Sequence, residues 1–197
     1  LLGLERFASL IYSLPYLFSS LLSPAFEGQR FWYLASYVAF LALYFAGHFA
    51  AAGLDVTACV RRPFDEYVIE SEKHPLRHPA RAVVDPAALG GPFDWVLVTV
   101  KAHQTADAAP WFDALCDADT TVVVMQNGIE GESRLAPFVH GAEVIPSVVY
   151  CGTELIAPGH TRHVSTGWLL VDDRLSTRRL AALTAASAAT VNVVDDY

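Results

Sequence analysis

Polar residues follow two apolar runs of the chain at the point where each run ends. The run over 94–100 leads directly into Lys101, and the run over 121–125 leads into Gln126 and Asn127. Runs this apolar are typical of buried strands, and the carboxyl ends of parallel strands line the ligand crevice of an open α/β sheet. We therefore expect Lys101 and Asn127 to lie side by side on one rim, where an ammonium and an amide suit a phosphorylated nucleotide and a small anionic substrate.

The order of apolar segments predicts how these two runs are positioned. From residue 53 onward strands alternate with helical stretches, which indicates parallel βαβ units in a doubly wound, mostly parallel α/β sheet. Residues 64–79 contain Pro75, Pro79 and mixed charges, and are expected to form a loop with a short edge element. Strands are expected at 54–60, 82–84, 94–100, 121–126, 144–150, 168–171 and 191–194, and helices at 105–116, 130–139 and 175–188.

Composition excludes several classes of function. The formal net charge of −8 at pH 7 argues against a nucleic-acid-binding surface, which needs a basic stripe. The three cysteines, at 59, 116 and 151, are far apart and lack metal-ligand spacing, so they indicate reduced thiols in a cytoplasmic protein. His160 and His163 would lie on opposite faces of a strand, with no carboxylate or cysteine completing a set. No metal site is therefore predicted.

The first 52 residues carry few charges and allow two interpretations. Residues 31–52 form an apolar stretch long enough to span a bilayer, with His48 as its only titratable group. The same stretch can form a buried strand and helix of the α/β domain. We favour the second interpretation, because leaving the fold would remove a central strand and helix. The domain is then expected over 30–197, preceded by an apolar extension over 1–29.

Four motifs in order connect the chain to a known family. They are the segments 53–61, 98–105, 126–128, and Pro158-Gly159 followed by Arg162-His163. With these spacings, residues 53–197 resemble the nucleotide-binding half of ketopantoate reductase (2-dehydropantoate 2-reductase). The resemblance implies a Rossmann-like domain that holds NADP, and a second, helical domain that closes over a small 2-keto acid. The implied reaction passes hydride from NADPH to ketopantoate, which gives pantoate for pantothenate and coenzyme A synthesis.

The resemblance also implies roles for individual residues. Arg61 would pair with the 2′-phosphate that distinguishes NADP from NAD, although it can also be a surface charge, with Arg62 in that role. Lys101 resembles a lysine that touches the cofactor, whereas a lone lysine at a strand end is often solvated. Asn127 resembles an asparagine that contacts cofactor and substrate, but Asn-Gly is also a common turn. Thr153 falls near a further cofactor contact, with a small gap in the alignment.

The chain departs from the family in its glycine-rich loop. An ungapped count places the three glycine positions of Gly-x-Gly-x-x-Gly on Tyr37, Ala39 and Ala42. Those glycines make the tight turn, admit the pyrophosphate and allow close helix packing. A Cβ at the first two positions occupies that space and restricts φ. A non-catalytic, degenerate binding module and a membrane-tethered variant therefore stay open beside the reductase.

The resemblance places the proton-donating lysine and the helical domain further along than Tyr197. The two lysines of this chain, Lys73 and Lys101, do not match that lysine. The catalytic residues are therefore expected outside these 197 residues, and the chain is interpreted as the cofactor-binding part. The sequence predicts no oligomeric state.

Overall fold

A helix over residues 41–51 begins the part of the chain that the structure describes, which is residues 41–195 of a computed structural model. Its apolar side chains recur at helical spacing and form one buried face. A Cβ added at Gly47 would lie 3.0 Å from Ile69 Cδ1, so this helix packs closely on β2 (Glu66–Glu70). The buried-helix interpretation of this stretch holds for its described part, and residues 31–40 lie outside the described residues. The buried face consists of Leu41, Tyr44, Phe45 and Phe49.

Two short strands form a separate parallel sheet. β1 (Thr57–Cys59) pairs with β4 (Arg81–Val83), and the Val60 amide donates to the Val83 carbonyl oxygen at 2.8 Å. The strand predicted at 54–60 is therefore shorter than expected. Among the described residues its one strand neighbour is β4, which offers only three residues for pairing.

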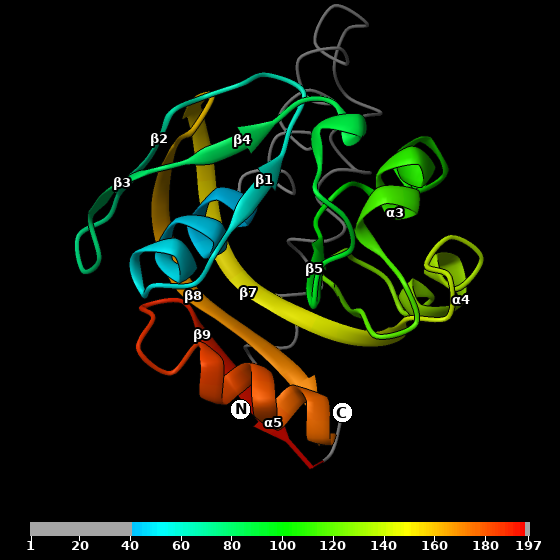
Figure 1. The fold of residues 1–197 in the computed structure, drawn as a ribbon. Coiled ribbons are helices and arrows are strands. Elements are labelled where there is room, and N and C mark those ends of the chain that lie inside the picture. Colours follow the sequence, from blue (N-terminus) through cyan, green and yellow to red (C-terminus); the bar gives the residue numbers. More distant parts are fainter. Residues whose placement is uncertain (1–40, 196–197) are drawn as a thin grey trace, which may run out of the picture. The chain divides into compact units, whose positions relative to one another are not determined.

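Three parallel strands contain the two apolar runs over 94–100 and 121–125. β5 (Trp95–Val98), β6 (Thr121–Val124) and the start of β7 (Glu143–Ala157) pair in parallel, with α3 (Ala109–Leu115) and α4 (Gly131–Leu135) as connections. Alternate strand residues pack against these helices, while others face the cluster that contains helix 41–51. Burial on both faces explains why these strands read as continuous apolar runs. Figure 1 shows α3 beside β5, with α4 further out on the same side.

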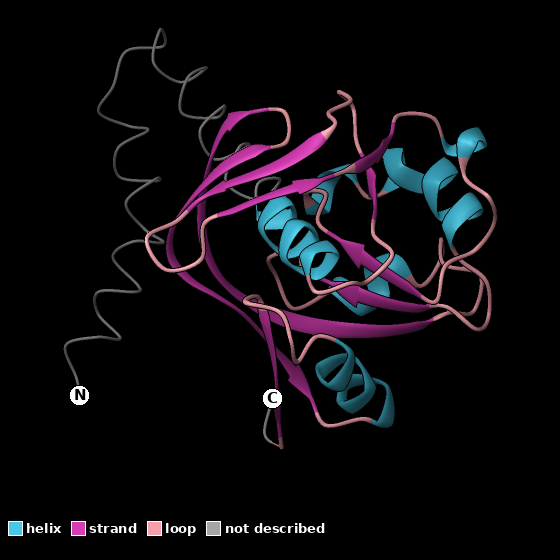
Figure 2. Ribbon diagram, turned by 60° about the vertical axis from the view of Figure 1, so that its left-hand side comes forward, coloured by secondary structure: helices cyan, strands magenta, loops and turns pink. Residues whose placement is uncertain are grey.

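A long antiparallel hairpin forms the middle of the sheet. β7 runs on past β6 to Ala157 and returns as β8 (His160–Asp172), so both strands are much longer than the predicted 144–150 and 168–171. Gly159 makes the turn with φ +74°, and a Cβ there would lie 2.5 Å from the Glu66 carbonyl oxygen. The outer halves of both strands bury polar residues such as Thr161 and expose apolar ones such as Val164, so the sequence lacks the apolar alternation expected of a strand. Figure 2 shows the long strands curving past helix 41–51.

The hairpin carries the remaining strands. β8 pairs in parallel with β2 and with β9 (Thr190–Val194), and β2 pairs with the edge strand β3 (Leu76–Pro79), giving the order β3-β2-β8-β7-β6-β5 with β9 on β8. α5 (Leu175–Leu183) connects β8 to β9. The loop with a short edge element predicted over 64–79 is thus a hairpin, in which β3 is the edge strand and tolerates the charges and prolines that argued against a longer strand.

The predicted helices are present but shorter. Two 3₁₀ turns, Ala102–Gln104 and Ala106–Ala108, precede α3, which begins beside Pro110 because proline is tolerated in a first helical turn. The helix predicted at 130–139 ends at Leu135, and the one predicted at 175–188 ends at Leu183. The described strands pair in parallel except in the two hairpins, as expected for a doubly wound, mostly parallel sheet.

No helix within residues 41–195 is long and apolar enough to cross a membrane. The described residues all belong to one compact unit. The boundary predicted at residue 30 and the extension over 1–29 lie outside the described residues.

Candidate functional site

The carboxyl ends of β5 and β6 form one rim of the sheet. Val98 and Val124 are paired in register, and the Met125 amide donates to the Val98 carbonyl oxygen at 2.9 Å. Lys101 and Asn127 each lie three residues beyond this pair. The structure therefore brings both residues onto neighbouring loops at the rim.

Lys101 is half-buried and sits between strand β5 and the first 3₁₀ turn. Its backbone is extended, with φ −62° and ψ 147°, and its carbonyl oxygen accepts a hydrogen bond from the Gln104 amide at 2.8 Å. Burial lowers the pKa of the Lys101 ammonium, because desolvation disfavours its charged form. An anion brought to this rim would restore part of the lost stabilisation of that charge.

Asn127 is exposed and begins a bend that protrudes from the rim. Gly128 has φ +105°, a left-handed conformation that L side chains rarely adopt, and Ile129 is fully exposed. The Asn-Gly pair thus does make a turn, as the alternative interpretation held. The turn leaves the Asn127 side chain exposed at the rim, and its contact with cofactor and substrate stays a prediction.

Gln126 lies beneath this turn and is 4% exposed. Its amide nitrogen Nε2 donates to the Val100 carbonyl oxygen at 2.8 Å and to Thr105 Oγ1 at 3.0 Å. Its Oε1 accepts from Arg134 Nη1 at 3.1 Å. Sequence reasoning placed Gln126 at the strand end but assigned it no role, because its partners are 8 to 26 residues away.

Arg61 follows β1, in the two-stranded sheet, and its side chain is exposed. Arg62 beside it is exposed as well, so the structure does not favour one of the two. The position, just after a strand end, is the one expected for an arginine that selects a 2′-phosphate. That role stays a prediction.

Thr153 is not brought to the rim. β7 passes the end of β6 at Ser147, whose Oγ donates to the Val124 carbonyl oxygen at 2.6 Å. Thr153 lies six residues further along the hairpin, a strand distance of roughly 20 Å, opposite His163. It is 2% exposed, and its buried Oγ1 has no hydrogen-bond partner among the described residues. Its cofactor contact stays a prediction.

The glycine-loop positions fall largely outside the described residues. Tyr37 and Ala39 lie there, and Ala42 is a half-buried residue of helix 41–51. The close approach to β2 that a small residue allows is made instead at Gly47, one turn later in this helix.

The two histidines of β8, His160 and His163, have partners other than a metal ion. His160 Nε2 lies 3.0 Å from Glu70 Oε1, and His163 Nδ1 lies 3.3 Å from Ser71 Oγ. The His163 ring also stacks on Tyr44, with ring centroids 4.1 Å apart. Across residues 41–195 no three His, Cys, Asp or Glu side chains gather in a way that could hold a metal ion.

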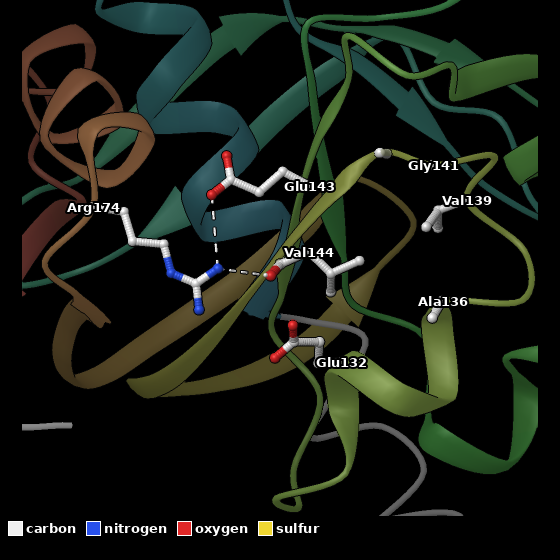
Figure 3. Close-up of a pocket in the computed structure, with 8 residues that line it drawn as sticks. Glu132, Ala136, Val139, Gly141, Glu143, Val144 and Arg174 are labelled. Atoms are coloured by element: carbon white, nitrogen blue, oxygen red, sulfur yellow. Dashed lines mark hydrogen bonds and ion pairs between the residues drawn. The ribbon is translucent and has the colours of Figure 1, made fainter.

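A pocket of about 310 Å³ lies at the opposite edge of the sheet (Figure 3). Glu143, which lines it, pairs with Thr121 at the start of β6 and so marks the amino end of the strands. Arg174 Nη1 in this pocket donates to the Val144 carbonyl oxygen at 3.2 Å and lies 3.7 Å from Glu143 Oε1. Its guanidinium is thus already engaged, and the pocket is separate from the Lys101–Asn127 rim.

Comparisons with known proteins give this rim a context. The family model described as ketopantoate reductase PanE/ApbA matches residues 41–174. The 2-dehydropantoate 2-reductase of Caulobacter vibrioides is 34% identical over 145 residues, which are 72% of this chain and 49% of that protein. The chain thus spans about half the length of the curated relatives it matches.

Solved structures agree on the fold. A PanE/ApbA family ketopantoate reductase from Ralstonia eutropha superposes with a TM-score of 0.69 at 31% identity, covering 79% of this chain and 54% of that one. A 2-dehydropantoate 2-reductase from Geobacter metallireducens gives a TM-score of 0.70 at 22% identity, covering 79% and 55%. The Rossmann-like fold class is confirmed, and the chain belongs to the ketopantoate reductase PanE/ApbA family.

Proposed function

We propose that this chain is the NADP-binding part of an enzyme that reduces 2-dehydropantoate to pantoate, for pantothenate and coenzyme A synthesis. The observation that carries the proposal is the pairing of Lys101 and Asn127 on neighbouring loops at the carboxyl edge of the family's own sheet. NADPH, when bound, supplies the hydride. The three free cysteines fit a reducing cytoplasm, where we place the reaction.

The rim residues suit a phosphorylated dinucleotide. Lys101 offers a partly desolvated ammonium for a phosphate or carboxylate, and Asn127 offers both a donor and an acceptor to a ribose, an amide or a keto acid. Arg61 offers a guanidinium whose two parallel donors match a phosphate. The role proposed for these side chains is to bind and orient the nucleotide.

The proposal is tested by measuring how the purified chain binds NADPH, with NADH alongside, by calorimetry and by quenching of tryptophan fluorescence. Binding that favours NADPH supports a working cofactor half. A folded chain that binds neither nucleotide contradicts the proposal and favours the degenerate module, in which, by the ungapped count, Tyr37 and Ala39 replace two of the family's glycines.

Substrate binding is tested separately, because Asn127 is proposed to contact the keto acid as well. Calorimetry of ketopantoate against the NADPH-loaded chain should detect heat for the parent and less for Asn127→Ala. Arg179→Ala removes an exposed side chain of α5 and serves as the control. Equal heats for the parent and Asn127→Ala would remove Asn127 from the substrate site.

A further inference from the structure

We infer that Thr105, Gln126 and Arg134 form a hydrogen-bonded clamp that sets the position of Lys101 relative to Asn127, so that Gln126 and Arg134 are positioning residues of the nucleotide site. The inference rests on the proposed function for its ligand but on this structure for its geometry. None of the three residues needs to touch the nucleotide. Each acts through the backbone of the two rim loops.

The clamp holds the backbone on both sides of Lys101. Gln126 Nε2 donates to the Val100 carbonyl oxygen at 2.8 Å, directly before Lys101. The Thr105 hydroxyl donates to the Ala102 carbonyl oxygen at 2.9 Å, directly after it. The same hydroxyl oxygen accepts from Gln126 Nε2 at 3.0 Å. The hydrogen bonds to the backbone before and after Lys101 therefore belong to one connected network.

Arg134 fixes the orientation of the Gln126 side-chain amide. A guanidinium has donors only, so the Gln126 atom that meets Arg134 Nη1 at 3.1 Å must be the amide oxygen. That contact turns Nε2 toward the Val100 carbonyl oxygen and the Thr105 hydroxyl. With the amide reversed, the Arg134 contact would pair two donors and the Val100 contact two acceptors, and the Thr105 hydroxyl could donate to Gln126 only by giving up its bond to the Ala102 carbonyl oxygen. The orientation of Gln126 therefore follows from the chemistry of its neighbours.

Burial makes the clamp rigid. Gln126 is 4% exposed and Thr105 is 2% exposed, so their hydrogen bonds do not compete with bulk water. Losing one partner would leave a buried polar atom unsatisfied, which costs more than the net value of the bond. Because Asn127 follows Gln126 directly, the segment that carries the amide and the loop that carries Lys101 are held by the same side chain.

Arg134 also lies against the turn itself. A Cβ added at Gly128 would lie 3.6 Å from Arg134 Nη2, which puts the guanidinium beside the Asn127-Gly128 backbone. Among the described residues no carboxylate forms an ion pair with Arg134. The contact that the structure gives it is the one to Gln126, so its effect on the rim passes through that amide.

The test uses amide hydrogen exchange and NADPH affinity on the whole chain. In Arg134→Met, the Gln104 and Thr105 amides, which donate to Lys101 and Ala102, should exchange about tenfold faster, and NADPH should bind roughly fivefold to tenfold more weakly. Arg134→Lys, which keeps a donor, should restore part of both. The Val68 amide, in the distant β2–β8 region, should be unchanged.

Variants of Gln126 separate positioning from folding. Gln126→Glu keeps the shape and the acceptor for Arg134 but removes both donations, and should loosen the same two amides while the chain stays folded. Arg134→Met added to Gln126→Leu should cause no further loss of affinity, because the two act as one unit. Arg179→Met, an exposed arginine of α5, is the control for loss of charge.

Outcomes for the clamp and for the proposed function are distinguishable. If the parent chain does not bind NADPH, the proposed function fails, while exchange at the 104 and 105 amides still tests the clamp. If exchange is unchanged in both Arg134→Met and Gln126→Glu, the inference is overturned. Additive losses of affinity would also overturn it, since they would show that Arg134 contacts the ligand directly.

Discussion

The rim of β5 and β6 and the outer part of the β7–β8 hairpin hold polar residues in opposite ways. At the rim, Asn127 is exposed, and the buried polar side chains beneath it, Gln126 and Thr105, are satisfied by named partners. In the hairpin region, Thr153 Oγ1, Tyr67 Oη and His48 Nε2 are buried without a partner among the described residues. The rim presents Asn127 and satisfies the polar side chains beneath it, whereas these three polar atoms, in and beside the hairpin, are buried without a partner.

This difference predicts that nucleotide binding and the free energy of unfolding depend on different residues. Changes at the rim should alter binding with little effect on the free energy of unfolding, because the presented side chains contribute few packing contacts. Changes in the hairpin region should lower the free energy of unfolding with little effect on binding. Four substitutions test this division, in order of expected effect.

The largest effect is expected at the turn of the hairpin. Gly159→Ala adds a Cβ 2.5 Å from the Glu66 carbonyl oxygen at a residue with φ +74°, and should lower the free energy of unfolding by about 3 kcal/mol. Urea denaturation gives this value. Gly53→Ala, with φ +94° and open space around the Cβ, isolates the backbone cost and should lose only about 1 kcal/mol. Equal losses would mean that β2 and the turn are not in contact.

A pH effect of similar size is expected from His48. Burial, together with His74 and His163 nearby, lowers the pKa of His48 from 6.5 to about 4. The unfolded chain therefore takes up a proton before the folded chain does, and the free energy of unfolding should fall by on the order of 2–3 kcal/mol between pH 6.5 and pH 4. Unfolding curves across this range measure it.

The matched variant for that effect is His48→Gln, which should flatten the pH dependence because it removes the titrating group. His103→Gln changes an exposed imidazole on the rim side and should keep the dependence of the parent. A His48→Gln chain that loses stability on acidification as steeply as the parent would assign the effect to other groups.

At the nucleotide site, Arg61→Ala should weaken NADPH binding by roughly tenfold to a hundredfold, as expected for loss of a charged hydrogen bond to a phosphate. NADH, which lacks the 2′-phosphate, should bind nearly as before. Calorimetry with both nucleotides measures the difference, and Arg62→Ala decides between the neighbouring arginines. If Arg61→Ala weakens both nucleotides alike, Arg61 does not read the phosphate.

The smallest effect is expected for Asn127→Ala. Loss of one exposed amide should weaken NADPH by about fivefold and change the free energy of unfolding by less than about 0.5 kcal/mol. Calorimetry and urea denaturation on the same sample measure both. A large fall in the free energy of unfolding would show that Asn127 stabilises the fold, and would contradict the proposed difference between rim and hairpin.

The sequence predicted the rim far better than the hairpin. β5 and β6 are apolar on both faces, so their runs and their polar ends at Lys101 and Asn127 could be located without a structure. In the outer hairpin polar residues such as Thr161 and His163 are buried while Ile156 and Val164 are exposed, so no apolar alternation marks it as a strand. The pairing of β8 with β2 joins segments far apart in the chain, which the local pattern does not encode.

The clamp was beyond sequence reasoning for a related reason. Nothing in the local pattern around Gln126 or Arg134 distinguishes them from other polar residues near a strand end or in a short helix. Their role arises only when the ends of β5 and β6 meet, because the Val100 carbonyl oxygen and the Thr105 hydroxyl oxygen then both accept from the Gln126 amide nitrogen.

The pairing of β2 with β8 affects how the domain folds during its synthesis on the ribosome. Val68 lies opposite His160, so two strands that share a ladder leave the ribosome more than ninety residues apart. Contacts of such long sequence separation form late and slow the folding of a domain. Until β8 has been synthesised, β2 exposes an unpaired strand edge, and the nascent chain passes through an interval in which it is prone to aggregation.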